Sequence, residues 1–422
     1  MSAPLRASFA FSPERQVPVG RLALDGNSVV FEYDPAFGEG LALNPTWRVA
    51  PGLIRPRDPR AFDGLHGVFG DSLPDAWGQL LLERRLRHAG RSTTELTVLD
   101  RLALVGREGR GALVYEPSRN EASGLHELDL DRLAEQTRQI LSGNAGDILH
   151  EIERLGGSSG GARPKVHVAL DDSGHARADE RGDLPAGFTS WIVKFHGSVD
   201  RFDDIGPLEA AYAEAARVAG IEMPRTRLIP AKSGPGYFAT ERFDRTAHGG
   251  RRHMLSVAGM LDVDWNLPSI SYELLLDAVR GVTRDEQAVA QMFRRMVFNV
   301  LAGNRDDHTK QHAFLMDEHG VWRLSPAFDL TLAAGPGNEH YLTINGRGRD
   351  IKRSDLLAVA QAQGINSRRA AEMLDAVATA VAKLPGIAKE FGVSKTTAKE
   401  LKNHLALGAT IVARTPGRRR SP

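Results

Sequence analysis

The sequence predicts an α+β protein in which short strands come first and a mainly helical part follows. Residues 20–33, 166–170 and 191–195 are short apolar or alternating segments bounded by glycine, proline or polar residues, which is typical of strands. From about His253 onward, apolar residues recur at helical spacing, interrupted by one hairpin. A chain of 422 residues is also too long for one ordinary core, so we expect two or three packed units.

The bulk composition excludes several classes of site. Lysine and arginine number 54 and acidic residues 53, so the overall charge gives no electrostatic reason to expect nucleic acid as the main partner. There is no cysteine, which rules out disulfides, thiolate nucleophiles and cysteine-ligated metal sites. The N-terminus does not resemble a signal peptide, and no apolar run approaches the roughly 18 residues that span a bilayer. We therefore expect a cytoplasmic protein that does not associate with a membrane.

The first 118 residues are expected to form a β-rich subdomain. Residues 20–33 alternate apolar and polar side chains around the sequence DGN, the pattern of a hairpin with a tight turn. Residues 74–88 form a helix with an apolar face, which we expect to pack on this sheet. Residues 106–118 indicate a glycine-rich turn, a short strand and an exit marked by proline. The acidic stretch that follows, up to about residue 155, indicates a helix-prone linker.

Residues 119–250 are expected to form a second unit around the two strands named above. Pro207 suits the first turn of a helix, alanines fill the body of that helix, and Gly220 is placed to end it. The sequence YFATERFDR, residues 237–245, predicts a further strand. The remaining residues, 251–422, are expected to form a mainly helical unit.

A polar loop follows a strongly apolar helix in this last unit. Gly303 is expected to end the helix, and residues 304–311 form a loop held against a hydrophobic element, where a rigid scaffold displays reactive groups. A hairpin with the turn DEHG then returns the chain, so we expect Phe328 and Asp329 to lie near Asp306. The buried face of the helix is marked by Met292, Phe293, Met296, Val297, Val300 and Leu301, which repeat at helical spacing.

The order of these polar groups matches the needs of a phosphoryl-transfer site. Such a site requires a carboxylate for the hydroxyl proton, oxygen ligands for Mg²⁺ and a lysine for the nucleotide phosphates. Protein kinases supply them in the order of a glycine-rich loop, a strand lysine, a helix glutamate, the sequence H-R-D-x-x-x-x-N and then D-F-G. This chain has, in that order, the glycine cluster at 156–161, Lys194, Glu209, Asp306, Gln311 and Asp329.

Each part by itself also has a structural explanation. Asp306 and Asp307 could cap a helix-terminal loop, and Lys194 could lie on an edge strand or extend its amine to solvent. The cluster at 156–161 could be a flexible linker, because it matches neither the dinucleotide-binding nor the Walker pattern. Glu209 could simply stabilise the start of a helix through the helix dipole.

A metal-dependent hydrolase is a third interpretation of the same loop. His308 and His312 together with Asp306 and Asp307 resemble a metal-binding cluster in composition. However, two histidines four residues apart in a loop lack the common face that a helix supplies. This interpretation also leaves Lys194 and the glycine cluster unexplained.

The assembled motifs resemble the HipA family, the kinase toxins of bacterial toxin–antitoxin pairs. The resemblance spans nearly the whole chain and implies a protein-kinase-like bilobal fold with an added N-terminal β-rich subdomain and an ATP site between the lobes. Its blocks, in family order, are GVFGDSLPDAWGQLLLERRL, GGSSGGARPK, WIVKF, ATERFDR, HMLSVAG, NRDDHTKQHAFL and SPAFDLT.

The resemblance assigns roles to individual residues. It implies that Asp306 is the catalytic proton acceptor, that Gln311 and Asp329 are Mg²⁺ ligands, and that Lys194 binds nucleotide phosphate with Glu209 as its supporting ion-pair partner. Further ATP contacts are expected from the phosphate loop (Gly160, Gly161, Ala162, Arg163, Pro164 and Lys165), the adenine-binding segment (Glu241, Arg242 and Phe243) and three residues near the catalytic aspartate (His308, Lys310 and Phe328).

The resemblance further implies partners and self-regulation. Autophosphorylation is expected at Ser158, with Ser159 as the alternative acceptor, because a phosphate there would repel bound ATP. The expected partners are a protein substrate, such as an aminoacyl-tRNA synthetase, and a helix-turn-helix antitoxin similar to HipB, with operator DNA bound only through that complex. Gln311 departs from the family's usual asparagine, and Mg²⁺ requires near-ideal geometry, so the alternative is a catalytically weak or silent subunit that acts by binding the antitoxin.

Overall fold

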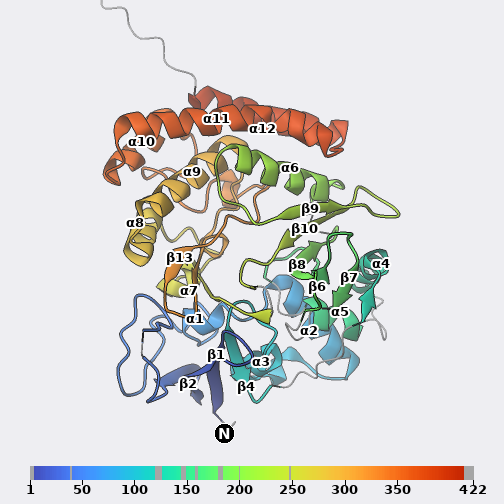
Figure 1. Cartoon of the computed structure of the whole chain (residues 1–422), viewed down its shortest axis with the longest axis vertical. Helices are drawn as coiled ribbons and strands as arrows, with labels where there is room; N and C mark the ends of the chain where they lie inside the picture. Colours follow the sequence, from blue (N-terminus) through green and yellow to red (C-terminus); the bar gives the residue numbers. More distant parts are fainter. Residues whose placement is uncertain are drawn as a thin grey trace, which may run out of the picture. The chain divides into compact units, whose positions relative to one another are not determined.

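The computed structural model describes residues 4–38, 40–118, 126–143, 149–156, 160–178, 184–198, 200–246 and 249–412 (Figure 1). The chain divides into two compact units. The first, here called the β-rich unit, comprises Met1–Gly206, Pro224–Trp265 and His312–Ser325. The second, the helical unit, comprises Pro207–Met223, Asn266–Gln311 and Pro326–Pro422. The predicted α+β class, with an N-terminal sheet and a helical C-terminal part, is confirmed. The predicted boundaries at residues 118 and 250 stay predictions.

The β-rich unit begins with a four-stranded antiparallel sheet in the order β3-β2-β1-β4. The predicted hairpin is confirmed, because Asp25 pairs with Ser28 across a turn in which Gly26 adopts a φ of +61°. Its strands are β1 (Leu5–Ala10), β2 (Gln16–Asp25), β3 (Ser28–Tyr33) and β4 (Leu113–Glu116). The connections carry α1 (Gly67–Gly70), the 3₁₀ turn η1 (Thr93–Glu95) and α3 (Val98–Val105).

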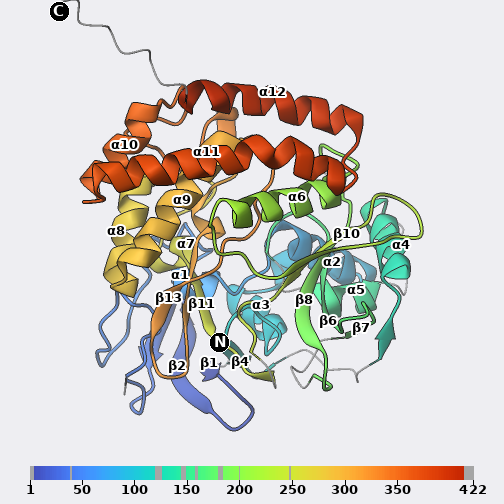
Figure 2. The same ribbon diagram turned by 45° about the horizontal axis from the view of Figure 1, so that its top comes forward.

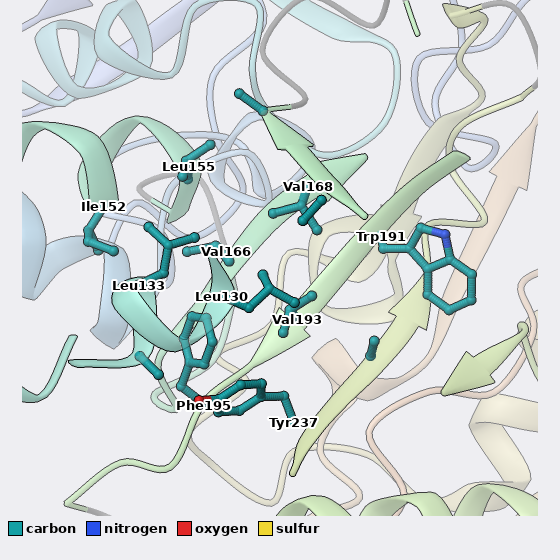
Figure 3. Close-up of a cluster of buried hydrophobic side chains, with 14 of the residues drawn as sticks. Leu130, Leu133, Ile152, Leu155, Val166, Val168, Trp191, Val193, Phe195 and Tyr237 are labelled. Atoms are coloured by element: carbon teal, nitrogen blue, oxygen red, sulfur yellow. The ribbon is translucent and has the colours of Figure 1, made fainter. Parts of the chain in front are cut away.

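A second antiparallel sheet has the order β5-β7-β6-β8-β10-β9, which places β6 and β8 at its centre. Val166, Val168 and Trp191 on these two strands are fully buried in an apolar cluster (Figure 3). The strands are β5 (Glu127–Leu128), β6 (Lys165–Leu170), β7 (Ala176–Ala178), β8 (Thr189–Lys194), β9 (Thr226–Ile229) and β10 (Tyr237–Glu241). The strand predictions for residues 166–170, 191–195 and 237–245 are confirmed, with small differences at their ends.

Two predictions about the packing of this region are wrong. The helix α2 (Ala76–His88) was expected to pack on the first sheet, but its Trp77 and Leu81 belong to the apolar cluster of the second sheet. The stretch expected to be a linker contains α4 (Leu130–Leu141) and α5 (Leu149–Gly156), whose apolar faces are buried in the same cluster (Figure 3). An apolar helix face shows that a helix is buried but not which sheet it covers, because that choice depends on contacts between distant segments.

A third, smaller sheet in this unit joins β11 (His253–Ser256) with the hairpin β12 (Ala313–Met316) and β13 (Trp322–Leu324). The hairpin is confirmed, with Gly320 in the left-handed conformation at its turn. The helical prediction from His253 onward is wrong for the first four residues, which form β11 and lead into α7 (Val257–Leu261).

The helical unit contains α8 (Tyr272–Thr283), α9 (Glu286–Ala302), α10 (Arg353–Ala362), α11 (Ser367–Glu390), α12 (Lys395–Val412) and the 3₁₀ turns η4 (Thr309–Gln311) and η5 (Pro336–Asn338). Figure 2 shows α11 and α12 lying side by side. Most of α6 (Ile205–Val218) also belongs here, and the hydroxyl of Tyr212 donates to the Ala302 carbonyl at the end of α9 (2.6 Å). As predicted, α6 has Pro207 in its first turn and is followed by Gly220 at φ +75°.

The apolar face predicted for α9 is confirmed. Met292, Phe293, Met296 and Val297 are fully buried, and Val300 and Leu301 are nearly so. The helix ends at Gly303, whose φ of +74° is a conformation that side-chain-bearing residues rarely adopt. None of the helices in the described part of the chain is long and apolar enough to cross a membrane.

Replacing Gly303 by alanine should destabilise the protein by about 1 kcal/mol, because alanine disfavours the left-handed conformation and its Cβ would lie 3.1 Å from Leu332. The matched control is Gly281→Ala in α8, where nothing lies within 4 Å of the added Cβ, and it should be neutral or stabilising. Denaturant unfolding of both variants measures the difference. Equal effects at the two positions would contradict the expectation.

The stability of the β-rich unit should fall as the pH is lowered below 6.5, partly because of His66. Burial lowers the pKa of His66 to about 4, so the folded state stays neutral while the unfolded state takes up a proton. This single group should remove about 1.5 kcal/mol between pH 6.5 and pH 5. His66 packs among the rings of Phe31, Trp47 and Phe69, so His66→Phe should flatten the pH profile of urea unfolding. Parallel profiles for the two proteins would rule this contribution out.

Candidate active site

The polar loop after α9 is fixed to its surroundings by backbone and side-chain hydrogen bonds. Arg305 N–H donates to the Ala333 carbonyl (3.0 Å), and Ala333 N–H donates to the Gly303 carbonyl (3.3 Å). Asn304 Nδ2 donates to Asn299 Oδ1 in α9 (3.0 Å). The loop therefore lies on a rigid helix and beside the segment that follows Asp329, all within the helical unit.

The two adjacent aspartates of this loop have opposite environments. Asp307 is fully buried, and its carboxylate accepts hydrogen bonds from the Tyr272 hydroxyl (2.8 Å), His340 Nδ1 (2.8 Å) and Tyr341 N–H (2.9 Å). Burial and the negative charge of Asp307 raise the pKa of Tyr272 well above its usual value, so its hydroxyl stays protonated as a donor. The Asp306 side chain is 45% exposed. Asp307 therefore anchors the loop, while Asp306 is accessible to solvent.

His308 and Lys310 are both buried in the loop. His308 Nε2 lies 3.8 Å from Asp306 Oδ1, and its ring meets the Tyr341 ring edge-on at 5.4 Å between centroids. Asp307 is already bonded to three donors, which argues against its acting as a metal ligand in the hydrolase interpretation. The described residues contain no group of three or more histidine, cysteine, aspartate or glutamate side chains that could hold a metal ion.

The two predicted magnesium ligands lie side by side in the helical unit. Gln311 Nε2 donates to Asp329 Oδ2 at 2.8 Å, and both side chains are partly exposed. Asp329 has a φ of +57°, an unusual conformation for a residue with a side chain that recurs at functional sites. An amide and a carboxylate are oxygen donors of the kind that Mg²⁺ prefers, so these residues fit that ion. Phe328, which precedes Asp329, is half-buried.

The β-rich unit holds two buried lysines directly opposite each other on its central strands. Lys165 begins β6, Lys194 ends β8, and the two residues pair in the sheet with 6% exposure each. Residues directly opposite each other in an antiparallel pair lie on the same face of the sheet, so the two lysine side chains share a face. The Lys194 ammonium also lies 5.6 Å from the Phe238 ring centre. The edge-strand explanation for Lys194 is wrong, because β8 pairs on both sides.

The described part of the predicted phosphate loop, residues 160–165, is held by specific hydrogen bonds. Lys165 Nζ donates to the Gly160 carbonyl, and Gly161 has a φ of +83°. Arg163 Nε donates to the Phe195 carbonyl (2.9 Å), while Phe195 N–H donates to the Pro164 carbonyl (2.9 Å). Ala162 is exposed, and Ser158 and Ser159 lie outside the described residues. Residues 160–165 are therefore not a flexible linker.

The charged side chains of the predicted adenine-binding segment form ion pairs with other residues of the protein. Glu241 forms a two-point ion pair with Arg225 (2.6 and 2.7 Å), and Phe243 is half-buried. Arg242 is buried and donates to Asp244 (2.8 and 3.0 Å). If this segment contacts a nucleotide, we expect the contact to come from its backbone and from Phe243.

A buried charge cluster surrounds Asp244, and the alternating charges of ERFDR are the only feature of the sequence that indicates it. The Asp244 carboxylate accepts from Gly111 N–H (2.7 Å) and Arg245 Nη1 (2.7 Å), which joins the first sheet to β10. Burial would raise the pKa of Asp244, but the guanidinium groups of Arg242 and Arg245 hold it well below its usual range. Burial and the same two arginines lower the pKa of His167 well below its usual value.

Glu209 is buried in the part of α6 that belongs to the helical unit, whereas Lys194 belongs to the β-rich unit. Their ion pair stays a prediction. The remaining role assignments, from Asp306 to the phosphate loop, likewise stay predictions that the geometry within each unit supports.

Substituting the two loop aspartates one at a time should change the stability of the protein by very different amounts. Asp307→Ala leaves three buried donors without their acceptor and should cost about 3 kcal/mol or more. Asp306→Ala removes a partly exposed side chain and should change the stability by no more than about 0.5 kcal/mol. Thermal unfolding of both variants measures the contrast. A strongly destabilised Asp306→Ala protein would contradict the assignment of Asp306 as the accessible member of the pair.

Comparisons with known proteins identify the domains of this chain. Residues 157–384, more than half of the chain, match the model of the HipA-like C-terminal domain, and residues 15–116 match that of the HipA N-terminal domain. A Sinorhizobium fredii protein named Putative kinase Y4dM is 29% identical over 156 residues, which cover 33% of this chain and 37% of that protein. A Haemophilus influenzae protein named Putative kinase is 21% identical over 191 residues, covering 42% and 53%. The chain thus matches about two fifths of the length of the first relative and about half of the length of the second.

A solved structure shows the same fold over nearly the whole chain. It is described as the Shewanella oneidensis MR-1 toxin–antitoxin system of HipA, HipB and its operator DNA. The matched chain has a TM-score of 0.68 at 17% identity, covering 97% of this chain and 96% of that one. With both domain models matched in order, the chain belongs to the HipA family.

Proposed function

We propose that this protein is an ATP- and Mg²⁺-dependent serine/threonine protein kinase of the HipA type. The observation that carries the proposal is the loop 304–311, in which a buried aspartate anchors an accessible one. The same loop ends at Gln311, which is hydrogen-bonded to Asp329. Asp306 lies in the same loop as Gln311, and transfer of a phosphoryl group to a hydroxyl requires both a carboxylate and oxygen ligands for Mg²⁺.

Asp306 would orient the hydroxyl of the substrate serine or threonine and accept its proton as the oxygen attacks the γ-phosphate of ATP, whose bond to the bridging oxygen breaks to release ADP. Its partial exposure suits this role, because a protein side chain must reach it. His308, 3.8 Å from the Asp306 carboxylate, would help to keep that carboxylate in place.

The remaining groups would bind ATP. Gln311 and Asp329 would hold Mg²⁺, which supplies positive charge to the phosphate oxygens when bound. Lys165 and Lys194 would bind the phosphates, since their side chains share one face of the sheet and a strand lysine is a recurrent phosphate ligand in kinases. We further propose that Glu209 orients Lys194.

The proposal extends to partners and regulation. The Shewanella oneidensis structure is described as containing HipA, HipB and operator DNA. By analogy, this chain would bind a helix-turn-helix antitoxin in the cytoplasm and would contact operator DNA only within that complex. Its substrate would be a cellular protein, for which an aminoacyl-tRNA synthetase is the first candidate, and Ser158 or Ser159 would be its own phosphorylation site.

One observation favours a second function, that of a catalytically silent subunit that acts by binding the antitoxin. Gln311 carries one methylene more than the asparagine usual in the family, which moves its amide oxygen relative to Asp329. Mg²⁺ tolerates little departure from octahedral geometry, so this difference bears directly on metal binding.

The kinase proposal predicts that the purified protein gains phosphate when it is incubated with Mg²⁺ and ATP. Mass spectrometry should locate the phosphate at Ser158 or Ser159, and Asp306→Ala should lower the rate at least about 100-fold, as expected for loss of a positioned general base. The matched control Asp277→Ala removes an exposed carboxylate of the same unit and should retain the wild-type rate.

The same assay separates the two functions. A protein that binds ATP but transfers no phosphate, and regains transfer as Gln311→Asn, would establish the silent subunit. A protein that neither binds ATP nor gains phosphate in either form would overturn the kinase proposal.

A further inference from the structure

The block GVFGDSLPDAWG, residues 67–78, is a prominent motif that the phosphoryl-transfer groups do not explain. Within it, Asp75 occupies the N-cap position of α2, where an aspartate normally accepts hydrogen bonds from its own helix. Its side chain makes no such bond. The Asp75 carboxylate instead accepts the N–H of Gly161 in the phosphate loop, at 2.9 Å.

Trp77, two residues further on, makes two more contacts with the same loop. Its backbone N–H donates to the Gly161 carbonyl (3.2 Å), and its indole Nε1 donates to the Lys165 carbonyl (3.0 Å). Both polar groups of the Gly161 backbone are thus bonded to the start of α2. Lys165, one of the two buried lysines, is held at the other end of the loop.

The segment that carries Asp75 is itself anchored. Asp71 is buried and accepts from the N–H (2.6 Å) and the hydroxyl (2.7 Å) of Ser256, the N-cap of α7. Arg110 donates to the Asp71 carbonyl (2.7 Å) and lies so close to Gly160 that an added Cβ there would come within 2.8 Å of its guanidinium. The loop therefore rests on a fixed support, and all of these residues belong to the β-rich unit.

We propose that Asp75, supported by Trp77, is a positioning residue that holds residues 160–165 in the conformation that binds ATP phosphates. This inference rests on the proposed kinase function and adds to it a role for the N-terminal region. The Asp75 carboxylate accepts a hydrogen bond from a loop amide and none from its own helix, so its position favours one conformation of the loop. Without it, the loop would populate other conformations, and the apparent ATP affinity would fall in proportion to the competent fraction.

The test compares Asp75→Ala and Asp75→Asn with the wild-type full-length protein. Asp129→Ala is the matched control, because Asp129 is the N-cap of α4 in the same unit and does bond to its own helix. Three quantities are measured: the KM for ATP and kcat of autophosphorylation, the affinity for Mg-ATP by calorimetry, and hydrogen exchange of the peptide that contains Gly161.

Asp75→Ala should raise the KM and the calorimetric Kd for ATP about tenfold, a change typical of losing one charge-assisted hydrogen bond. It should leave kcat at saturating ATP within about twofold and should accelerate exchange at Gly161. Asp75→Asn retains an acceptor oxygen and should restore much of the ATP affinity. Asp129→Ala should lower thermal stability without changing any of the three quantities.

Unchanged ATP affinity in Asp75→Ala would overturn the inference, whether or not exchange at Gly161 accelerates. A kcat that falls as far as the ATP affinity would also overturn it, because a residue that only positions the loop acts on binding. If the wild-type protein binds ATP but transfers no phosphate, the kinase proposal fails, while weaker ATP binding by Asp75→Ala would still support the positioning role.

Discussion

The buried carboxylate of Asp307 is the constraint on which the candidate active site depends. An ionised group with no solvent exposure must have its charge satisfied by protein donors, since an unpaired buried charge is very costly. Its donors come from α8 through Tyr272 and from the segment at His340 and Tyr341, so one carboxylate ties three parts of the helical unit together. With Asp307 directed inward, the neighbouring Asp306 is left accessible.

The β-rich unit is organised around buried charges as well. Asp244 is paired with Arg242 and Arg245, so its charge is compensated within the protein and serves to join two sheets. Lys165 and Lys194 lie opposite each other on central strands, which places two lysine side chains on one face of the sheet. This arrangement is the reason for proposing them as the groups that bind the ATP phosphates.

Features that depend on local sequence were predictable, and features that depend on distant contacts were not. The turn after Asp25 and the end of α9 at Gly303 follow from a few neighbouring residues, because turn and helix-end geometry is a local property. The packing of α2 on the second sheet depends on which apolar surfaces meet in space. For the same reason, the hydrogen bond from Gly161 to Asp75 links residues far apart in the sequence and could not be anticipated from either.

The residues alone are enough to predict the α+β class, the order of the candidate phosphoryl-transfer groups and a family whose motifs recur along the whole chain. Contacts between distant segments establish which of two adjacent aspartates is buried, that Lys165 and Lys194 both lie on central strands, and which helix is bonded to the predicted phosphate loop. These features escape prediction because a side chain's chemistry depends on its solvation and its partners. Asp306 and Asp307 are the same amino acid in the same loop, and burial with three donors is what separates an anchor from a candidate catalyst.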